Sequence, residues 1–435
     1  MSERAGQRLR DTAARPTRAY VLHPALKSAS ARRLPEHGLG EALALAAALP
    51  ELEICGGEVV RLARAHPGTL LGSGKVAELK NRFKADAIDL VLIDGTVSPV
   101  QQRNLEKEWG VKLLDRTSLI LEIFADRART REGVLQVELA ALSYQRTRLV
   151  RAWTHLERQR GGFGFVGGPG ETQLEADRRA IDDQVIRLKR QLEQVVKTRE
   201  LHRAARRKVP FPIVALVGYT NAGKSTLFNR ITGADVMAKD MLFATLDPTM
   251  RGVALPSGAK IILSDTVGFI SDLPTQLVAA FRATLEEVLS ADLILHVRDI
   301  SHPETMEQAA DVADILGSLG VKEETPIIEV WNKLDLVDAS QRGALTAQAS
   351  QRPMVLPVSA LTGEGVDPLL AMISATLDED RNEAVLTIPF DQGRRRAWLH
   401  DQNVIQNETE GEDGWRITVR WTARQQSRWR QFQAS

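Results

Sequence analysis

Features that mark secreted and membrane proteins are scarce in this sequence. Its single cysteine, Cys55, excludes an intramolecular disulfide, so we expect a reducing compartment. The longest apolar stretch, 42–49, is too short to cross a membrane, and we expect no integral membrane segment. The first residues are rich in arginine but lack the apolar core of a secretory signal. Together these absences predict a cytoplasmic protein.

A strong charge bias is also missing. The 57 Lys and Arg residues are balanced by 56 Asp and Glu residues, which argues against general coating of DNA or another polyanion. The length predicts about three domains, and a hydrophobic share of 43% allows packed cores. Changes in pattern suggest these divisions: a disordered basic tail at 1–18, an amino-terminal α/β subdomain at 19–129, a helical hairpin at 130–208, a central α/β domain at 209–380 and a small α+β domain at 381–435.

A phosphate-binding pattern stands in the central domain. It follows an apolar run at 211–217, suited to a buried strand, and Thr226 lies in the helix expected after it. In such a loop, backbone N–H groups surround a phosphate, Lys224 reaches the β- and γ-oxygens, and the Ser225 hydroxyl ligates Mg²⁺. The pattern G-x-x-x-x-G-K-[ST] is met by Gly218, Tyr219, Thr220, Asn221, Ala222, Gly223, Lys224 and Ser225.

Three further motifs follow apolar runs, each at the predicted carboxyl end of a strand. Asp265 can hold Mg²⁺ through water, and Gly268 can bring its N–H to a γ-phosphate. The Asp335 carboxylate can accept hydrogen bonds from N1–H and the 2-amino group of guanine, which adenine does not offer. The order and spacing predict GTP and GDP as ligands. The three motifs are Asp265, Thr266, Val267 and Gly268; Asn332, Lys333, Leu334 and Asp335; and Ser359, Ala360 and Leu361.

A switch segment is expected between the phosphate loop and Asp265. Thr245 is the candidate for a second Mg²⁺ hydroxyl; Thr249 is the competing choice, but we interpret it as a turn residue after Pro248. We expect Lys224, Thr245 and Gly268 to act in GTP hydrolysis. The residues of the segment that we assign to the nucleotide are Phe243, Ala244, Thr245, Leu246 and Asp247.

Phe269 stands where Ras-like enzymes carry a water-orienting glutamine directly after the Asp-x-x-Gly glycine. A phenylalanine cannot orient water, so intrinsic hydrolysis should be slow. Asn221 either helps to hold K⁺ beside the phosphates or stabilises the loop, and the residues leave both open. A large partner that orders the switch segments is a further possibility. The group that positions the attacking water is not identified.

A long helical pattern at 171–208 has apolar residues at heptad spacing, Leu174, Ile181, Leu188 and Val195. It predicts an antiparallel partner in the preceding helical pattern, so we expect a monomer. A Gly-rich loop at 161–170 joins the two helices, and several arginines, among them Arg146 and Arg148, precede it. The length of the loop favours RNA contact over an inert linker. The candidate contacts are Arg160, Phe163 and Phe165.

The two ends of the chain are predicted to form smaller units. Short strands alternate with helices before residue 129, which predicts a mostly parallel sheet, and Gly72 to Val76 is interpreted as a turn, not a second nucleotide site. After residue 381 we expect a strand, a helix, two strands and a basic tail containing Arg428, Trp429 and Arg430. RNA contact and a tryptophan-anchored core both remain open for this unit.

Longer strings carry a resemblance over nearly the whole chain. The segments 115–117, 123–128, 132–140 and 168–175 resemble those of HflX-type GTPases, a ribosome-associated, ribosome-splitting family. The resemblance implies a P-loop GTPase domain, binding to the large ribosomal subunit and its rRNA near the peptidyl-transferase centre, and Mg²⁺ on Ser225 and Thr245. From the residues alone, two alternatives remain: a signalling GTPase with a protein effector, and a nucleotide-gated rRNA-binding assembly factor.

Overall fold

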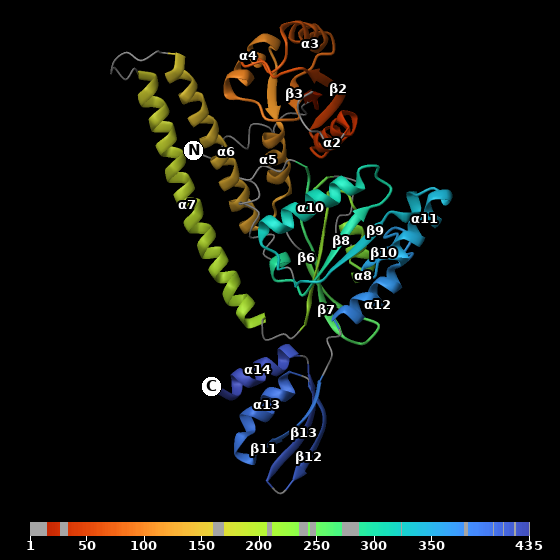
Figure 1. The fold of residues 1–435 in the computed structure, drawn as a ribbon. Helices are drawn as coiled ribbons and strands as arrows, with labels where there is room; N and C mark the ends of the chain where they lie inside the picture. The colour runs from red at the N-terminus through yellow and green to blue at the C-terminus, as the bar shows by residue number, and fades with distance from the viewer. Residues whose placement is uncertain are drawn as a thin grey trace.

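The described part of the chain forms three sheets with helices around them (Figure 1). In the part of the chain that is described, no helix is both long and apolar enough to cross a membrane. The computed structural model describes residues 15–26, 34–159, 169–206, 211–234, 242–243, 249–271, 287–322, 324–377, 382–402, 404–411, 413–421 and 423–434.

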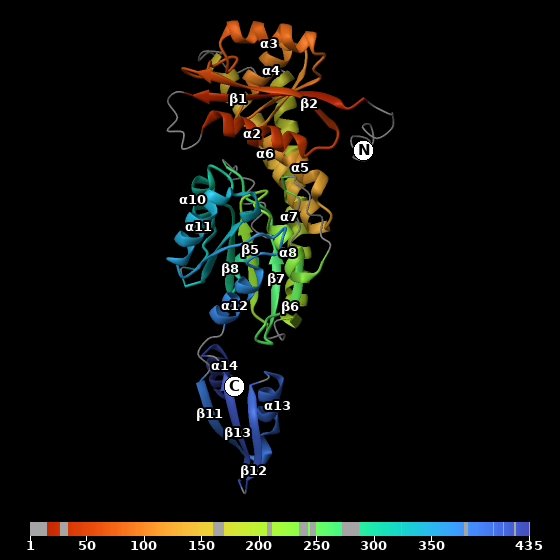
Figure 2. The same cartoon turned by 90° about the vertical axis from the view of Figure 1, so that its right-hand side faces the viewer.

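The amino-terminal sheet is fully parallel, with strand order β2-β1-β3-β4. In Figure 2, α2 and α5 lie on the face toward the central domain, and α3 and α4 lie on the opposite face. Strand β1 begins at Thr17, so the boundary predicted after residue 18 falls inside this strand, and residues 1–14 lie outside the described part. The elements are β1 (Thr17–Leu26), α2 (Pro35–Ala47), β2 (Leu52–Leu62), α3 (Ser73–Ala85), β3 (Leu90–Ile93), α4 (Pro99–Trp109), β4 (Lys112–Asp115) and α5 (Arg116–Arg127).

The hairpin consists of α6 (Arg131–Gln159) and α7 (Pro169–Arg206), which run side by side in opposite directions (Figure 1). Val185 on the heptad face is buried, as expected for packing between the helices. Helix α7 begins at Pro169, two residues inside the predicted loop, because proline is tolerated in a first helical turn. Arg160, Phe163 and Phe165 lie in 160–168, outside the described residues.

Two of the arginines that precede the loop in sequence have partners within the protein. Arg148 of α6 donates to Asp115, the last residue of β4, at 3.0 Å. Arg146 pairs with Asp182 on α7 at 2.8 Å. Both side chains therefore stabilise the hairpin and its junction with the amino-terminal sheet.

The central sheet has the order β10-β9-β8-β5-β7-β6, and only β6 is antiparallel. Helices α8 and α12 pack on one face, and α10 packs on the other. This confirms the predicted P-loop α/β domain. Its elements are β5 (Ile213–Gly218), α8 (Lys224–Thr232), β6 (Thr249–Ala254), β7 (Lys260–Asp265), β8 (Leu293–Asp299), α10 (Thr305–Leu319), β9 (Ile327–Asn332), the short η1 (Leu334–Leu336), α11 (Ala339–Ser350), β10 (Val355–Pro357) and α12 (Val366–Leu377).

One hydrophobic core joins the amino-terminal and central domains. Ile120 and Phe124 of α5 belong to the same buried cluster as Val217 of β5 and Phe269 after β7. The burial of such side chains stabilises by about 1.5–3 kcal/mol each. The two domains are therefore packed as one body at this junction.

The carboxyl-terminal unit is an antiparallel sheet, order β11-β13-β12, covered by two helices. The predicted basic tail is instead a helix, α14, because Trp429 and Phe432 share one side of it and pack against Trp398. Trp429 is buried, whereas Arg430 is exposed. The elements are β11 (Asn382–Ile388), η2 (Phe390–Gln392), α13 (Gly393–Asp401), β12 (Ile405–Gly411), β13 (Gly414–Trp421) and α14 (Ala423–Ala434).

Candidate nucleotide-binding site

The phosphate-loop pattern lies between the end of β5 and the start of α8, as predicted. Its conformation requires glycine at two positions. Gly218 has a φ of +153°, and a Cβ there would overlap the Val297 carbonyl oxygen. Gly223 has a φ of +91°, and a Cβ there would overlap the Asn332 amide. The loop is thus closely packed against the neighbouring strands, with the α8 amino terminus directed at the space it surrounds.

Lys224 is buried inside this loop. Its Nζ donates to the carbonyl oxygens of Gly218, at 3.1 Å, and Tyr219, at 2.8 Å. Burial lowers the pKa of Lys224 to about 8, although the nearby charge of Asp265 opposes this shift. A buried cation whose direct partners are carbonyl oxygens favours the approach of an anion, and phosphate oxygens have the required charge.

Two oxygen-bearing side chains that could ligate a metal ion lie close to Lys224. The Ser225 hydroxyl donates to Asp265 Oδ2 at 2.7 Å, and Asp265 is fully buried at the end of β7. A hydroxyl and a carboxylate are oxygen ligands of the kind that Mg²⁺ prefers. Thr226 follows within α8 and is half-buried. The donor set therefore fits a magnesium ion bound together with phosphates.

The interpretation of Thr249 as a turn residue was wrong. Thr249 is the first residue of β6 and stands opposite Asp265 in the antiparallel pair with β7. The preceding Pro248 favours an extended backbone as much as a turn, and strand pairing decides between them. Thr245, Ala244, Leu246 and Asp247 lie outside the described residues. Phe243, at the start of the switch segment, is buried against Phe124, with 4.7 Å between the ring centroids.

The segment after Asp265 is hydrogen-bonded to the phosphate loop. Phe269 N–H donates to Gly218 O at 3.1 Å, and Phe269 O accepts from Thr220 N–H at 2.7 Å. The Phe269 ring is buried in the shared core, where it cannot contact a water beside the phosphates. A Cβ on Gly268 would come within 2.9 Å of both Thr220 Cα and Lys224 Nζ. Gly268 is therefore in close contact with the loop.

Thr266 and Val267 fix the same segment to the protein core. The Thr266 hydroxyl donates to Leu216 O at 2.6 Å, and both Thr266 and Val267 are buried. Their side chains fix the backbone that leads to Gly268.

Asn332 joins two of the predicted motifs. Its Nδ2 donates to Ala222 O at 2.8 Å, and its Oδ1 accepts from Ala360 N–H at 2.9 Å. Asn332 is buried, so its side chain satisfies both of these backbone groups away from water. The motif that follows β9 therefore positions both the phosphate loop and the loop after β10.

The remaining members surround the expected base position. Asp335 Oδ1 accepts from the Ser359 hydroxyl at 2.5 Å, and Lys333 Nζ pairs with Asp299 at 2.8 Å. Leu334 is buried, whereas Leu361 is exposed. All described residues of the four predicted motifs thus converge at the carboxyl edge of the central sheet.

Sequence reasoning missed one group of residues at this site. Glu41 of α2 accepts a hydrogen bond from the Tyr219 hydroxyl, and Arg116 at the start of α5 donates to Ser271 O at 2.9 Å. Glu41 carries no motif and lies 178 positions from Tyr219, so no local pattern could have indicated it. Arg116 lies within a string that carried the family resemblance, which was the only available signal.

Known proteins are similar to this chain over most of its length. The chain matches the family models described as "GTP-binding GTPase N-terminal" (36–125), "GTP-binding GTPase Middle Region" (127–206), "50S ribosome-binding GTPase" (213–333) and "HflX C-terminal domain" (344–431). It is 53% identical to a GTPase HflX of Magnetococcus marinus over 347 residues, covering 80% of this chain and 79% of that protein. The chain belongs to the HflX family of GTPases.

A second HflX relative, from Escherichia coli, is 44% identical over 374 residues, 86% of each chain. A solved structure of a GTP-binding protein from Sulfolobus solfataricus with GDP matches at a TM-score of 0.45 and 24% identity, covering 82% of this chain and 98% of that one. Membership of the HflX family assigns GTP binding and hydrolysis of GTP to GDP and phosphate to this chain. In GTPases, Mg²⁺ generally accompanies the nucleotide.

Proposed function

We propose that this HflX-family GTPase acts in the cytoplasm on the large (50S) ribosomal subunit and splits or remodels ribosomes. The observation that carries the proposal is the match of residues 213–333, which contain the phosphate loop, to the family described as "50S ribosome-binding GTPase". We assign the GTPase domain to 209–380, between the hairpin and the carboxyl-terminal unit. The two relatives named HflX support the same assignment over most of the chain.

The contacts of the site support definite roles in hydrolysis. The loop N–H groups and Lys224 bind the β- and γ-phosphates, and Asp335 accepts hydrogen bonds from guanine. Ser225 and Thr245 would hold Mg²⁺ directly, and Asp265 through water; the ion would neutralise charge that develops on the phosphates. Gly268 brings its N–H to the γ-phosphate. The hydrogen bonds between Phe269 and the loop keep the Gly268 backbone in position for this contact.

The buried Phe269 ring supports slow intrinsic hydrolysis and stimulation by the ribosome. No glutamine stands at this position, and the ring is in the core, so a partner has to complete the arrangement that activates water. Asn221 is exposed in the loop at a φ of +59°. This exposure supports a role for its side-chain oxygen in binding K⁺ beside the phosphates.

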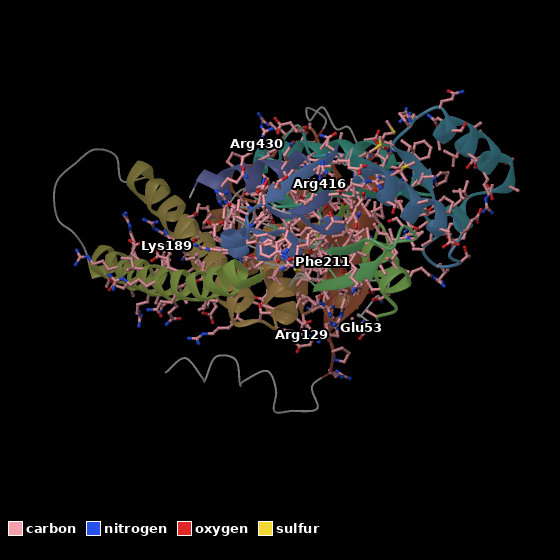
Figure 3. All side chains as sticks on the ribbon, turned by 90° about the horizontal axis from the view of Figure 1, so that it is seen from below. Glu53, Arg129, Lys189, Phe211, Arg416 and Arg430 are labelled. Atoms are coloured by element: carbon pink, nitrogen blue, oxygen red, sulfur yellow. The ribbon has the colours of Figure 1, made fainter. Side chains whose placement is uncertain are left out.

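The hairpin supports contact with rRNA. Its two helices run alongside the amino-terminal sheet, and the end of α6 and the start of α7 lie away from the GTPase domain (Figure 1). Figure 3 shows Lys189 on the side of the molecule occupied by the hairpin. Basic groups along an exposed helix attract the phosphates of nucleic acid. Among the α7 residues whose burial is described, the exposed basic ones are Arg178, Arg179, Arg187, Lys189 and Arg190.

A multiple-turnover assay with and without purified large ribosomal subunits tests this function. We expect strong stimulation of GTP hydrolysis by the subunits and binding that weakens steeply with salt. Lys224→Ala should abolish hydrolysis, and subunit splitting should be lost with it. If the subunits give no stimulation, the proposal is wrong. If Lys224→Ala leaves both binding and splitting intact, the chain is an rRNA-binding factor in which the nucleotide only sets the conformation.

A further inference from the structure

A buried polar cluster connects the amino-terminal domain to the phosphate loop. Glu41 on α2 accepts from the Tyr219 hydroxyl and, at 2.8 Å, from the Ser271 hydroxyl. Arg116 pairs with Glu41 and donates to Ser271 O at 2.9 Å. The Ser271 N–H in turn donates to the Tyr219 hydroxyl oxygen at 2.7 Å. Two residues of the amino-terminal domain thus contact two of the GTPase domain through several bonds.

This cluster is largely shielded from water, and a further carboxylate, Asp94, fixes Arg116. The side chains of Arg116 and Glu41 are only 9% and 13% exposed. Asp94 pairs with Arg116 at 2.6 Å and with His23 at 2.7 Å. Burial by itself would raise the pKa of Asp94, but the hydrogen bond from His23 and the charge of Arg116 lower it, so Asp94 is ionised at neutral pH. Arg116 is therefore fixed by the carboxylates of Glu41 and Asp94 in the position from which it donates to Ser271 O.

Both contacts end on parts of the molecule that surround the phosphates. Tyr219 is the second residue of the phosphate loop, and its carbonyl oxygen accepts from Lys224 at 2.8 Å. Ser271 is two residues beyond Phe269, which pairs with Tyr219 in an isolated β-bridge. Glu41 therefore bonds to the loop and to the segment after Gly268 at the same time. In GTPases that segment moves when the γ-phosphate binds or leaves, so these bonds differ between the two nucleotide states.

We propose that Glu41 and Arg116 are positioning residues of the GTPase site, supplied by the amino-terminal domain. They set the position of the Gly268-to-Ser271 segment relative to Tyr219. Small misplacements near a reacting group lower rates strongly, so their loss reduces hydrolysis more than it reduces binding of GDP. The inference concerns intrinsic hydrolysis by the full chain and does not depend on ribosomes.

The test is a double-mutant cycle on intrinsic hydrolysis in the absence of ribosomes. Glu41→Gln keeps the shape but removes the charge, and Tyr219→Phe removes only the hydroxyl. We expect each variant to lower kcat about tenfold or more, with the affinity for GDP changed less than about threefold. The double variant should be no slower than the worse single one, because both remove the same connection.

Glu36→Gln is the matched control. Glu36 lies on the same helix, α2, in an ion pair with Arg61 in which the two side chains are 58% and 70% exposed, and its loss should leave kcat unchanged. Ser271→Ala is a second variant outside the amino-terminal core, and it should lower kcat without further loss when combined with Glu41→Gln. If the effects of Glu41→Gln and Tyr219→Phe multiply, or if Glu41→Gln behaves like Glu36→Gln, the proposal is overturned. Failure of ribosomal stimulation in the separate subunit assay would not bear on it.

Discussion

Asn332 and Ala222 are joined by a hydrogen bond of 2.8 Å across 110 positions of sequence. The same side chain accepts from Ala360 N–H, so one buried amide connects the phosphate loop, the strand β9 and the loop after β10. The nucleotide site is therefore stabilised as a unit, and several consequences can be measured.

Replacing Asn332 by alanine removes both bonds and leaves two backbone groups without this partner. We expect a loss of about 1–3 kcal/mol in the free energy of unfolding, together with weaker GDP binding. Thermal melting and calorimetric titration with GDP measure the two effects. Asn104→Ala is the control, since Asn104 donates to Gly68 O in the amino-terminal domain from an exposed position. Equal behaviour of the two variants would contradict the role of Asn332.

Asp335→Asn should change the preferred base. An amide at this position offers a donor to the 2-oxo group of xanthine but cannot accept both guanine hydrogens. The affinity for GDP should fall about tenfold or more, and binding of xanthosine diphosphate should appear. Competition titrations with both nucleotides provide the measurement. A variant that loses both nucleotides equally would show that the bond between Asp335 and Ser359 matters only for structure.

The lowered pKa of Lys224 predicts proton uptake on nucleotide binding. With a pKa of about 8, the amine is mostly neutral at pH 8.5 in the free protein, and a bound phosphate raises its pKa again. Binding of GDP should take up protons at pH 8.5 and little at pH 7, so the affinity falls as the pH rises above 8.

Calorimetry of GDP binding in buffers of different ionisation enthalpy measures this uptake. Lys75→Gln is the control, because Lys75 lies in the amino-terminal domain, where it pairs with Glu58 at 2.8 Å. The uptake should persist in this variant. Proton release at pH 8.5 in the unmodified chain would show that Lys224 is not the titrating group.

Gly218→Ala should destabilise the central domain. The new Cβ would overlap the Val297 carbonyl oxygen in the adjacent strand β8, and the φ of +153° is strained for any L side chain. Overpacking of this kind costs about 1–3 kcal/mol. Gly252→Ala on β6 meets open space and is the control for denaturant unfolding. A tolerated Gly218→Ala would mean that the loop backbone shifts at little cost.

The convergence of the nucleotide motifs was predictable because each follows a strand of one parallel sheet. The carboxyl ends of such strands lie at the same edge, so the order of Asp265, Asn332 and Ser359 along the chain was enough to bring them together. The helical hairpin was equally predictable from the sequence, since its heptad spacing extends over many turns.

Other features depend on contacts between distant parts of the chain. Thr249 belongs to a strand only because β7 lies beside it, and Arg148 has a protein partner because Asp115 reaches the hairpin. The spacing of Trp429 and Phe432 was a local signal for a helix that we interpreted as a tail. The position of Glu41 beside Tyr219 follows from how two domains pack, which no short pattern encodes.

The buried cluster shared by α5 and the central sheet predicts how the molecule unfolds. Heat should unfold the amino-terminal and central domains in a single cooperative step, because unfolding of either one would expose the apolar residues of the other in this cluster. The carboxyl-terminal unit, with a separate cluster around Trp421, should give a melting transition of its own. If the chain were cut between the hairpin and β5, each separated fragment would expose apolar side chains of this cluster and should self-associate.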